Sequence, residues 1–259
     1  MSADRAPGPP KGRPSFPARL TPGREPAVRA ASAVARPPVS PPSARHSSND
    51  AARWAMVRRL QAQGLTHPSV VQAMAAVERH RFVDAGLAYQ AYEDTSLPIG
   101  LGQTISKPSV VARMLELLCA GQTLPLGRVL EVGTGCGYQA AVLSALASEV
   151  YSMERLRGLH DKARQNLRFF RLPNVHLLLG DGSQGYAQGA PYAGIVAAAG
   201  GEAIAQAWLD QLQVGGRLVA PVQTDNTQQH LVVVERTPQG YVSQTHEAVL
   251  FVPLKSGVV

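Results

Sequence analysis

Cysteine, long apolar stretches and aromatic residues are all scarce in this chain of 259 residues. The two cysteines, Cys119 and Cys136, are too few for a disulfide framework or a four-cysteine zinc site, and they favour a reducing compartment. No apolar run of about 18 residues or more is present, so the sequence predicts no membrane-spanning helix. The first residues also lack the apolar stretch of a secretory signal. We therefore expect a cytoplasmic protein that does not act at a membrane.

Positive charge exceeds negative charge, but the excess lies mainly in one segment. The formal net charge is +7, and residues 1–50 hold eight Lys or Arg against three Asp or Glu. The same segment holds eleven of the twenty prolines, and such a composition buries too little apolar surface to offset the entropy of ordering. We expect residues 1–50 to form a disordered, basic extension and residues 51–259 to form one domain. Contact with nucleic acid is expected, if at all, only through the extension.

Histidines and charged clusters do not indicate a metal centre. The seven histidines are scattered, without an H-E-x-x-H or a paired spacing, so no metal ligand is predicted. The arginines of residues 155–171 are spread over one helix, which favours a solvated face over an RNA-binding surface. The charged segment ERHRFVD (78–84) flanks the apolar pair Phe82 and Val83, and we interpret it as a surface or packing element.

From residue 128 onward, strand-like and helix-like segments alternate, which is typical of a doubly wound, mostly parallel α/β sheet. The strand-like runs are 128–132, 149–153, 175–179, 193–197, 217–221 and 230–235. The helix-like stretches between them are 139–147, 156–170 and 203–213. Helices are also expected at 51–63, near Pro68 and from Pro108. Residues 230–253 contain the turn 237–240 and predict a C-terminal antiparallel hairpin.

The segment VLEVGTGCGY (129–138) stands between a predicted strand and a predicted helix. Its three glycines let the backbone turn tightly and approach a ligand closely. They are Gly133, Gly135 and Gly137. Glu154 ends the next predicted strand, where its carboxylate can accept hydrogen bonds from both hydroxyls of a ribose. Asp181 and Gly182 follow the third predicted strand, where they can contact the edge of an adenine. Because ligands bind outside the carboxyl ends of parallel strands, these positions predict an adenosine-shaped site.

The spacing of the glycines distinguishes between adenosine cofactors. A dinucleotide site has G-x-G-x-x-G, whereas Tyr138 stands here where the third glycine is expected. The sequence also has no phosphate-binding G-x-x-x-x-G-K-[ST] loop. The G-x-G-x-G spacing resembles that of S-adenosylmethionine (AdoMet)-dependent methyltransferases of the Rossmann-like class. Glu131 and Thr134 then lie beside the methionine part of the cofactor, and Glu131 is expected to orient its ammonium group.

A further resemblance is more specific and covers the chain from about residue 65 to its end. It rests on YEDTSLPIGLGQTISKP (92–108), VLEVGTGCGYQAAVLS (129–144), GDG (180–182), VGGRLVAPV (214–222) and FVPL (251–254). These segments resemble the protein-L-isoaspartate O-methyltransferase family. TISKP is the most discriminating piece, because methyltransferases in general lack it.

The resemblance implies methyl transfer from AdoMet to the α-carboxylate of isoaspartyl residues in damaged proteins. The ester then closes to a succinimide, and S-adenosylhomocysteine (AdoHcy) is the other product. Ser106 is expected to donate a hydrogen bond to the substrate carboxylate, while Thr104 and Ile105 shape the loop over the cofactor. Val252, Pro253 and Leu254 are expected to form part of the peptide groove. No general base is required, because the nucleophilic carboxylate has a pKa of about 3 to 4.

Two departures from the family pattern leave alternatives open. Ala193 begins a strand where the family often has Asp, and AAAGGEA (197–203) replaces a Thr-Ala-Ala-Pro-like run, which puts the contacts of that loop in doubt. Cys136 is interpreted as a small packed side chain.

Two other functions are alternatives to isoaspartyl methylation. A methyltransferase of the same fold acting on RNA, anchored by the basic extension, is one alternative. An AdoMet-binding interaction protein without catalysis is the other.

Overall fold

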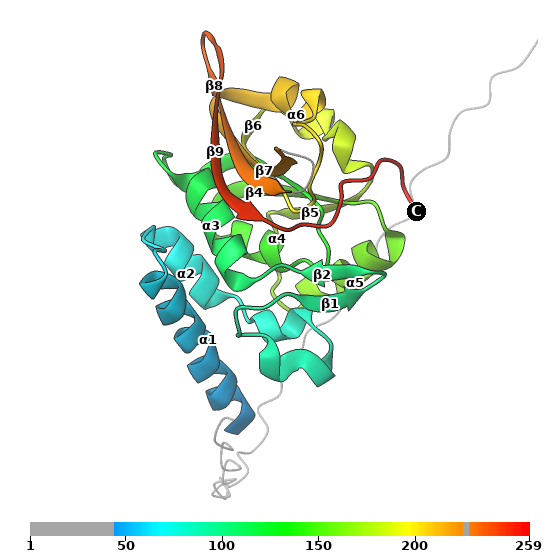
Figure 1. Ribbon diagram of the computed structural model, residues 1–259. Helices are drawn as coiled ribbons and strands as arrows, with labels where there is room; N and C mark the ends of the chain where they lie inside the picture. The colour runs from blue at the N-terminus through cyan, green and yellow to red at the C-terminus, as the bar shows by residue number, and fades with distance from the viewer. Residues whose placement is uncertain (1–43, 225–227) are drawn as a thin grey trace, which may run out of the picture. The chain divides into compact units, whose positions relative to one another are not determined.

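The computed structural model describes residues 44–224 and 228–259, which contain one large mixed sheet (Figure 1). Its strands are β3 (Leu126–Val132), β4 (Ala147–Glu154), β5 (Val175–Leu179), β6 (Tyr192–Ala197), β7 (Leu212–Gln223), β8 (Gln229–Thr237) and β9 (Gly240–Val249). They lie in the order β5-β4-β3-β6-β7-β8-β9, with β3 to β7 parallel and β8 and β9 antiparallel. This confirms the predicted doubly wound sheet and its C-terminal hairpin.

Helices pack against the sheet. The α-helices are α1 (Ala44–Ala62), α2 (Pro68–Ala76), α3 (Pro108–Cys119), α4 (Tyr138–Leu143), α5 (Arg157–Leu167) and α6 (Gln206–Gln211). Four short 3₁₀ helices are η1 (Arg79–Phe82), η2 (Ala85–Gln90), η3 (Gly182–Gln184) and η4 (Ala187–Gly189). None of the helices in the described residues is both long and apolar enough to cross a membrane.

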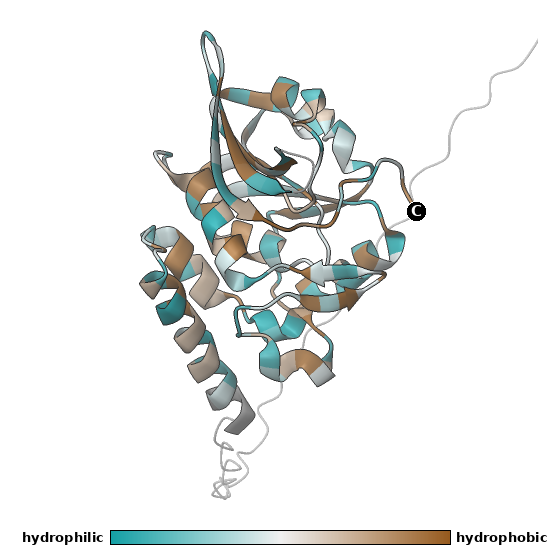
Figure 2. Ribbon diagram, viewed as in Figure 1, coloured by the Kyte–Doolittle hydropathy of each residue, from teal (hydrophilic) through white to brown (hydrophobic). Residues whose placement is uncertain are grey.

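Alternation of side chains along the strands divides the core into two apolar clusters. On β3, Val129 packs with the helices α1 to α4, whereas Leu130 belongs to the cluster that contains Trp208 of α6. Neighbouring strand residues point to opposite faces, so a strand covered on both sides must be apolar throughout. Figure 2 shows this as brown hydrophobic colour along the central strands. Because each central strand contributes side chains to both clusters, its residues are apolar throughout, and this made the strands recognisable in the sequence.

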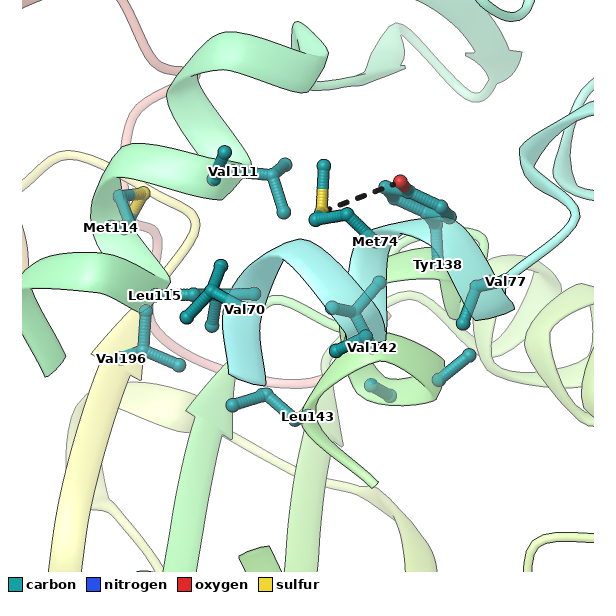
Figure 3. Packing of buried hydrophobic residues seen from close by; sticks show 14 of the residues in the cluster. Val70, Met74, Val77, Val111, Met114, Leu115, Tyr138, Val142, Leu143 and Val196 are labelled. Carbon is teal, nitrogen blue, oxygen red and sulfur yellow. Dashed lines mark hydrogen bonds between the residues drawn. The ribbon is translucent and has the colours of Figure 1, made fainter. Parts of the chain in front are cut away.

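The helices α2, α3 and α4 meet in the larger cluster (Figure 3). Met74 of α2 lies beside Tyr138 of α4, whose hydroxyl is 3.7 Å from the methionine sulfur. Val111 and Leu115 of α3 are buried in the same cluster. Burial of each such side chain stabilises the fold by about 1.5–3 kcal/mol. The packing therefore anchors the start of α3, and with it the TISKP segment that precedes Pro108.

The segment before α3, where Thr104 and Ile105 were expected to shape a loop over the cofactor, contains two short strands. It forms a two-stranded antiparallel hairpin of β1 (Leu97–Gly100) and β2 (Gln103–Ile105). The turn between them has positive φ angles at three consecutive residues, Gly100, Leu101 and Gly102. Glycine adopts such angles without steric cost, which explains the two glycines at the turn.

Element boundaries also differ from the sequence prediction. Helix α1 begins at Ala44 rather than Ala51, so residues 44–50 are helical and do not belong to an extension. The rest of the predicted disordered extension, residues 1–43, lies outside the described residues. Helix α6 is shorter than the predicted 203–213, because Leu212 already belongs to the long strand β7.

Candidate active site

A cavity of about 390 Å³ opens at the carboxyl ends of β3 and β4. Its wall contains the glycine loop after β3, the end of β4, the β1–β2 hairpin and the C-terminal segment 252–255. Eleven of the residues predicted for the site line it: Thr104, Ile105, Ser106, Gly133, Thr134, Gly135, Glu154, Gly182, Val252, Pro253 and Leu254. Gly137, Glu131 and Asp181 do not line it. The cavity thus brings together chain segments separated by more than half the sequence.

The glycine loop needs its glycines for two different reasons. All three have positive φ angles, which other residues rarely adopt. A Cβ at Gly135 would lie 3.2 Å from Ile99 of β1, and a Cβ at Gly137 would lie 3.1 Å from Leu167 of α5. The first contact would push the loop against the hairpin, and the second would displace α5. Gly137 does not line the cavity; it allows α5 to pack closely against the start of α4, which follows the glycine loop.

Glu154 is buried at the end of β4, and its carboxylate holds the glycine loop. One oxygen accepts the N–H of Gly135 at 2.8 Å, and the other accepts the N–H of Leu156 at 3.0 Å. An ionised carboxylate offers about four acceptor positions, so capacity remains for hydroxyl groups of a ligand. Glu154 thus joins the first two strand ends at the wall of the cavity.

Glu131 lies one layer below the loop and is completely buried on β3. The hydroxyl of Ser152 donates to one of its oxygens, and the hydroxyls of Thr134 and Ser152 are 2.6 Å apart. The amide of Gln139 lies near the carboxyl group, but the other oxygen has no hydrogen bond of normal geometry in the described part of the chain. Burial raises the pKa of Glu131 to about 8, and the neighbouring charge of Glu154 acts in the same direction. Ser152 and Thr134 link the Glu131 carboxyl group to the cavity wall, and its contact with a ligand ammonium group stays a prediction.

The carboxylate of Asp181 accepts hydrogen bonds from Ser183 and from the C-terminal segment. One oxygen accepts the N–H and the hydroxyl of Ser183, at 2.9 and 2.7 Å, and the other accepts the N–H of Gly257 at 2.7 Å. Burial favours the neutral acid, but these hydrogen bonds and the charge of Arg155 hold the pKa of Asp181 below its usual value. Gly182, which follows it, lines the cavity, and a Cβ there would lie 2.5 Å from Val132.

The C-terminal segment passes across the strand ends and closes one side of the cavity. The carbonyl of Val252 accepts the N–H of Gly200 at 2.8 Å, and Leu254 donates to the carbonyl of Gly200 at 2.7 Å. Further on, Val259 forms backbone hydrogen bonds with Arg155 and Arg157. The unusual segment 197–203 therefore has a clear structural task, because its backbone at Gly200 carries the residues 252–254.

Ser106 stands between this cavity and a second one of about 560 Å³. Thr104, Ala198 and Val252 line both cavities as well, so the two spaces meet at the TISKP segment. Among the described residues that line the second cavity, Lys107 is the one with a charged side chain. The arrangement offers one compartment for a nucleoside and a neighbouring one for an anionic partner.

Arg79 lies behind this segment and was not predicted from the sequence as a site residue. It is completely buried, and its Nη2 donates to the carbonyl of Ser106 at 2.7 Å. The sequence offers a weak signal for this, because Arg79 precedes the buried Phe82 by three positions and therefore shares its helical face.

Both cysteines are buried and unpaired, as interpreted for Cys136. Burial raises the pKa of Cys136 to about 11 and that of Cys119 to about 12. No group of three His, Cys, Asp or Glu residues is placed to hold a metal ion within 44–224 and 228–259.

Comparisons with known proteins point to one enzyme family. Residues 51–259 match the family model described as Protein-L-isoaspartate(D-aspartate) O-methyltransferase. A protein-L-isoaspartate O-methyltransferase of Leptothrix cholodnii is 59% identical over 212 residues, which cover 81% of this chain and 75% of the relative. One of Ralstonia nicotianae is 53% identical over 248 residues, covering 90% and 77% of the two chains.

Solved structures agree with the sequence relatives. A structure named protein-L-isoaspartate O-methyltransferase superposes with a TM-score of 0.71 at 26% identity, covering 80% of this chain and 67% of the other. A putative protein-L-isoaspartate O-methyltransferase from Plasmodium falciparum, in complex with S-adenosyl-L-homocysteine, superposes with a TM-score of 0.69 at 21% identity, covering 78% and 98%. The second likeness shows the shared fold.

Proposed function

Because the chain belongs to the protein-L-isoaspartate(D-aspartate) O-methyltransferase family, we propose that it methylates the free α-carboxylate of L-isoaspartyl residues in damaged proteins. The methyl donor is AdoMet, and the ester formed starts repair through a succinimide. The observation that carries the residue assignment is the position of Ser106, which borders both cavities. Reducing conditions suit the two unpaired thiols, and we place the activity in the cytoplasm.

The first cavity suits AdoMet in size and in donor set. Its volume of about 390 Å³ lies in the range of small-molecule sites. Gly133 and Gly135 present bare backbone to the cavity, and Glu154 has acceptor positions left for the ribose hydroxyls. When bound, AdoMet supplies an electrophilic methyl group on a positively charged sulfur.

The remaining cofactor contacts are assigned to residues around the first cavity. Thr104, Ile105 and Thr134 surround the methionine part, and Gly182 lies against the adenine. Asp181 fixes the turn that carries Gly182, through its hydrogen bonds to Ser183 and Gly257. Glu131 supports the glycine loop from below through Ser152 and Thr134.

The second cavity suits the isoaspartyl peptide. A carboxylate with a pKa of about 3 to 4 is already ionised at pH 7, so the site needs no general base. Ser106 supplies a hydroxyl donor that holds one carboxylate oxygen in place, and the charge of Lys107 attracts the anion. Val252, Pro253 and Leu254 exclude water from the reacting atoms and offer backbone groups to substrates of varied sequence. Such positioning accounts for a large part of the barrier reduction in a transfer between two bound groups.

One assay tests this function. The purified protein is incubated with labelled AdoMet and an isoaspartyl peptide, beside the same peptide with a normal aspartyl residue. Base-labile label on the isoaspartyl peptide alone is expected, because the product is a methyl ester. Label on tRNA instead, or binding of AdoMet without transfer to any acceptor, would contradict the proposal.

A further inference from the structure

Arg79 carries a positive charge in the interior, and the function described above does not use it. It begins the 3₁₀ helix η1, and none of its side chain is exposed. Its Nε donates to the carbonyl of Ala91 at 2.8 Å, and its Nη2 donates to the carbonyl of Ser106 at 2.7 Å. The guanidinium also lies over the ring of Tyr138, 4.7 Å from the centroid.

The surroundings of Arg79 contain no contacting carboxylate among the described residues. Asp94 is near enough to favour the charged form, but its carboxylate accepts the N–H of Ser109. The third guanidinium nitrogen, Nη1, has no hydrogen-bond partner in the residues that the structure describes. Burial lowers the pKa of Arg79, yet an arginine stays protonated in proteins. A buried cation without an anionic partner is costly, and its contacts here serve to join two backbone carbonyls.

The bond to Ser106 determines the orientation of the next peptide group. In a trans peptide the carbonyl and the N–H point in opposite directions. With the Ser106 oxygen turned towards Arg79, the N–H of Lys107 is turned away from Arg79. No backbone or side-chain acceptor for this N–H exists in the described part of the chain, and Lys107 lines the second cavity.

We propose that Arg79 is a positioning residue for methyl transfer, which holds the Ser106–Lys107 peptide plane so that two donors face the substrate carboxylate. The donors are the Ser106 hydroxyl and the Lys107 N–H. Hydrogen bonds from two donors to one carboxylate are charge-assisted and fix its direction. This inference rests on the proposed function, because it concerns the acceptor carboxylate of the same reaction.

The first test replaces Arg79 by lysine. A lysine keeps the charge but lacks the planar fork that reaches two carbonyls in fixed directions. For Arg79→Lys we expect AdoHcy affinity close to that of the wild type and a lower midpoint of thermal unfolding, because a buried carbonyl loses its donor, so binding is measured below that midpoint. The affinity of the AdoHcy-bound protein for an isoaspartyl peptide, and kcat/KM, are expected to fall at least tenfold. Peptide and AdoHcy affinities are measured by titration calorimetry.

Arg81 provides a matched control from the same short helix. Its side chain pairs with Glu78 and lies over the ring of Phe169, 3.5 Å from the centroid, without contact to the TISKP segment. Arg81→Lys is expected to leave all of these quantities within twofold of the wild type. If Arg79→Lys also stays within twofold, or if it weakens AdoHcy and peptide binding in the same proportion, Arg79 has no positioning role.

A second test leaves the core untouched and decides the question even if Arg79 variants fail to fold. Lys107 has a φ of −53°, which proline adopts readily, and its N–H has no structural partner to lose. Lys107→Pro and Lys107→Ala both remove the ammonium group, but only the proline removes the N–H. We expect kcat/KM to be at least fivefold lower for the proline variant than for the alanine variant, at equal AdoHcy affinity. Equal kcat/KM values would overturn the proposal.

The outcomes distinguish failure of the proposed function from failure of the proposed role of Arg79. A wild-type protein that puts no base-labile methyl group on the isoaspartyl peptide refutes both the function and the role of Arg79. An active wild type with unaffected Arg79→Lys and indistinguishable Lys107 variants refutes only the role of Arg79.

Discussion

Replacing Glu131 by glutamine should change how the stability of the protein depends on pH. Glu131 is completely buried and receives a hydrogen bond from Ser152, while its other oxygen lies near Gln139 without a hydrogen bond of normal geometry in the described residues. Burial raises its pKa from 4.5 to about 8. Between these two values the folded protein keeps a proton on Glu131, whereas the unfolded chain releases it.

The sign and size of the effect follow from this difference. A raised folded-state pKa contributes stability that is fully present below pH 4.5 and is lost as the pH rises through about 8. The contribution declines by about 1.4 kcal/mol per pH unit within this window, and by roughly 4–5 kcal/mol across it. Glutamine keeps the shape and stays neutral at every pH, so Glu131→Gln removes this slope.

Urea unfolding of both proteins between pH 5 and pH 8, at constant ionic strength, measures the effect. The difference between their unfolding free energies isolates Glu131, because all other groups titrate in both proteins. We expect the wild type to lose stability relative to the variant as the pH rises, with unchanged m-values. Two parallel curves would show that the carboxyl group is not held neutral, and the account of its burial would be refuted.

Further variants test other parts of the site. Ser106→Ala should lower kcat/KM by about 10- to 150-fold while AdoHcy affinity stays within about twofold, since the lost hydrogen bond to a charged group is worth about 1.5–3 kcal/mol; equal loss of both would remove its substrate role. Glu154→Ala should weaken AdoHcy binding by about 1–3 kcal/mol in calorimetry, and unchanged affinity would contradict its assignment to the ribose. Gly182→Ala should destabilise the fold by about 1–3 kcal/mol in thermal unfolding, because its Cβ would overlap Val132, and a neutral effect would mean that the wall yields. Deletion of residues 1–43 should leave turnover on short peptides unchanged, and a large drop would place that segment in the site.

Much of the sheet could be predicted because burial on both faces makes its strands apolar throughout. The run 175–179 coincides with β5, and the runs at 128–132 and 193–197 fall inside β3 and β6. The β1–β2 hairpin was missed, because its strands are four and three residues long and include the polar Gln103 and Thr104. Short strands give too few alternations for a pattern to be detected.

The candidate site was predictable where backbone geometry demands a residue type. Gly135 and Gly182 stand where a Cβ would collide with a neighbour, so their identity marks the cavity wall. Asp181 was assigned to a ligand, but the sequence does not reveal that its carboxylate also accepts hydrogen bonds from Ser183 and from Gly257, which lies far along the chain. Arg79 was missed because a charged side chain is expected at the surface. Only the tertiary contacts to Ala91 and Ser106 distinguish it from Arg81.

The two buried thiols make the folded protein a poor target for alkylating reagents. Thiolate is the reactive form, and the raised pKa values of Cys119 and Cys136 keep both thiols protonated at neutral pH. Cys136 lies in the cavity wall and Cys119 at the end of α3, so modification of either reports the opening of a different part of the core. The rate at which a maleimide labels each cysteine can be followed by mass spectrometry. Comparing the rates with and without a bound nucleoside therefore measures how much the nucleoside slows the opening of each part of the core.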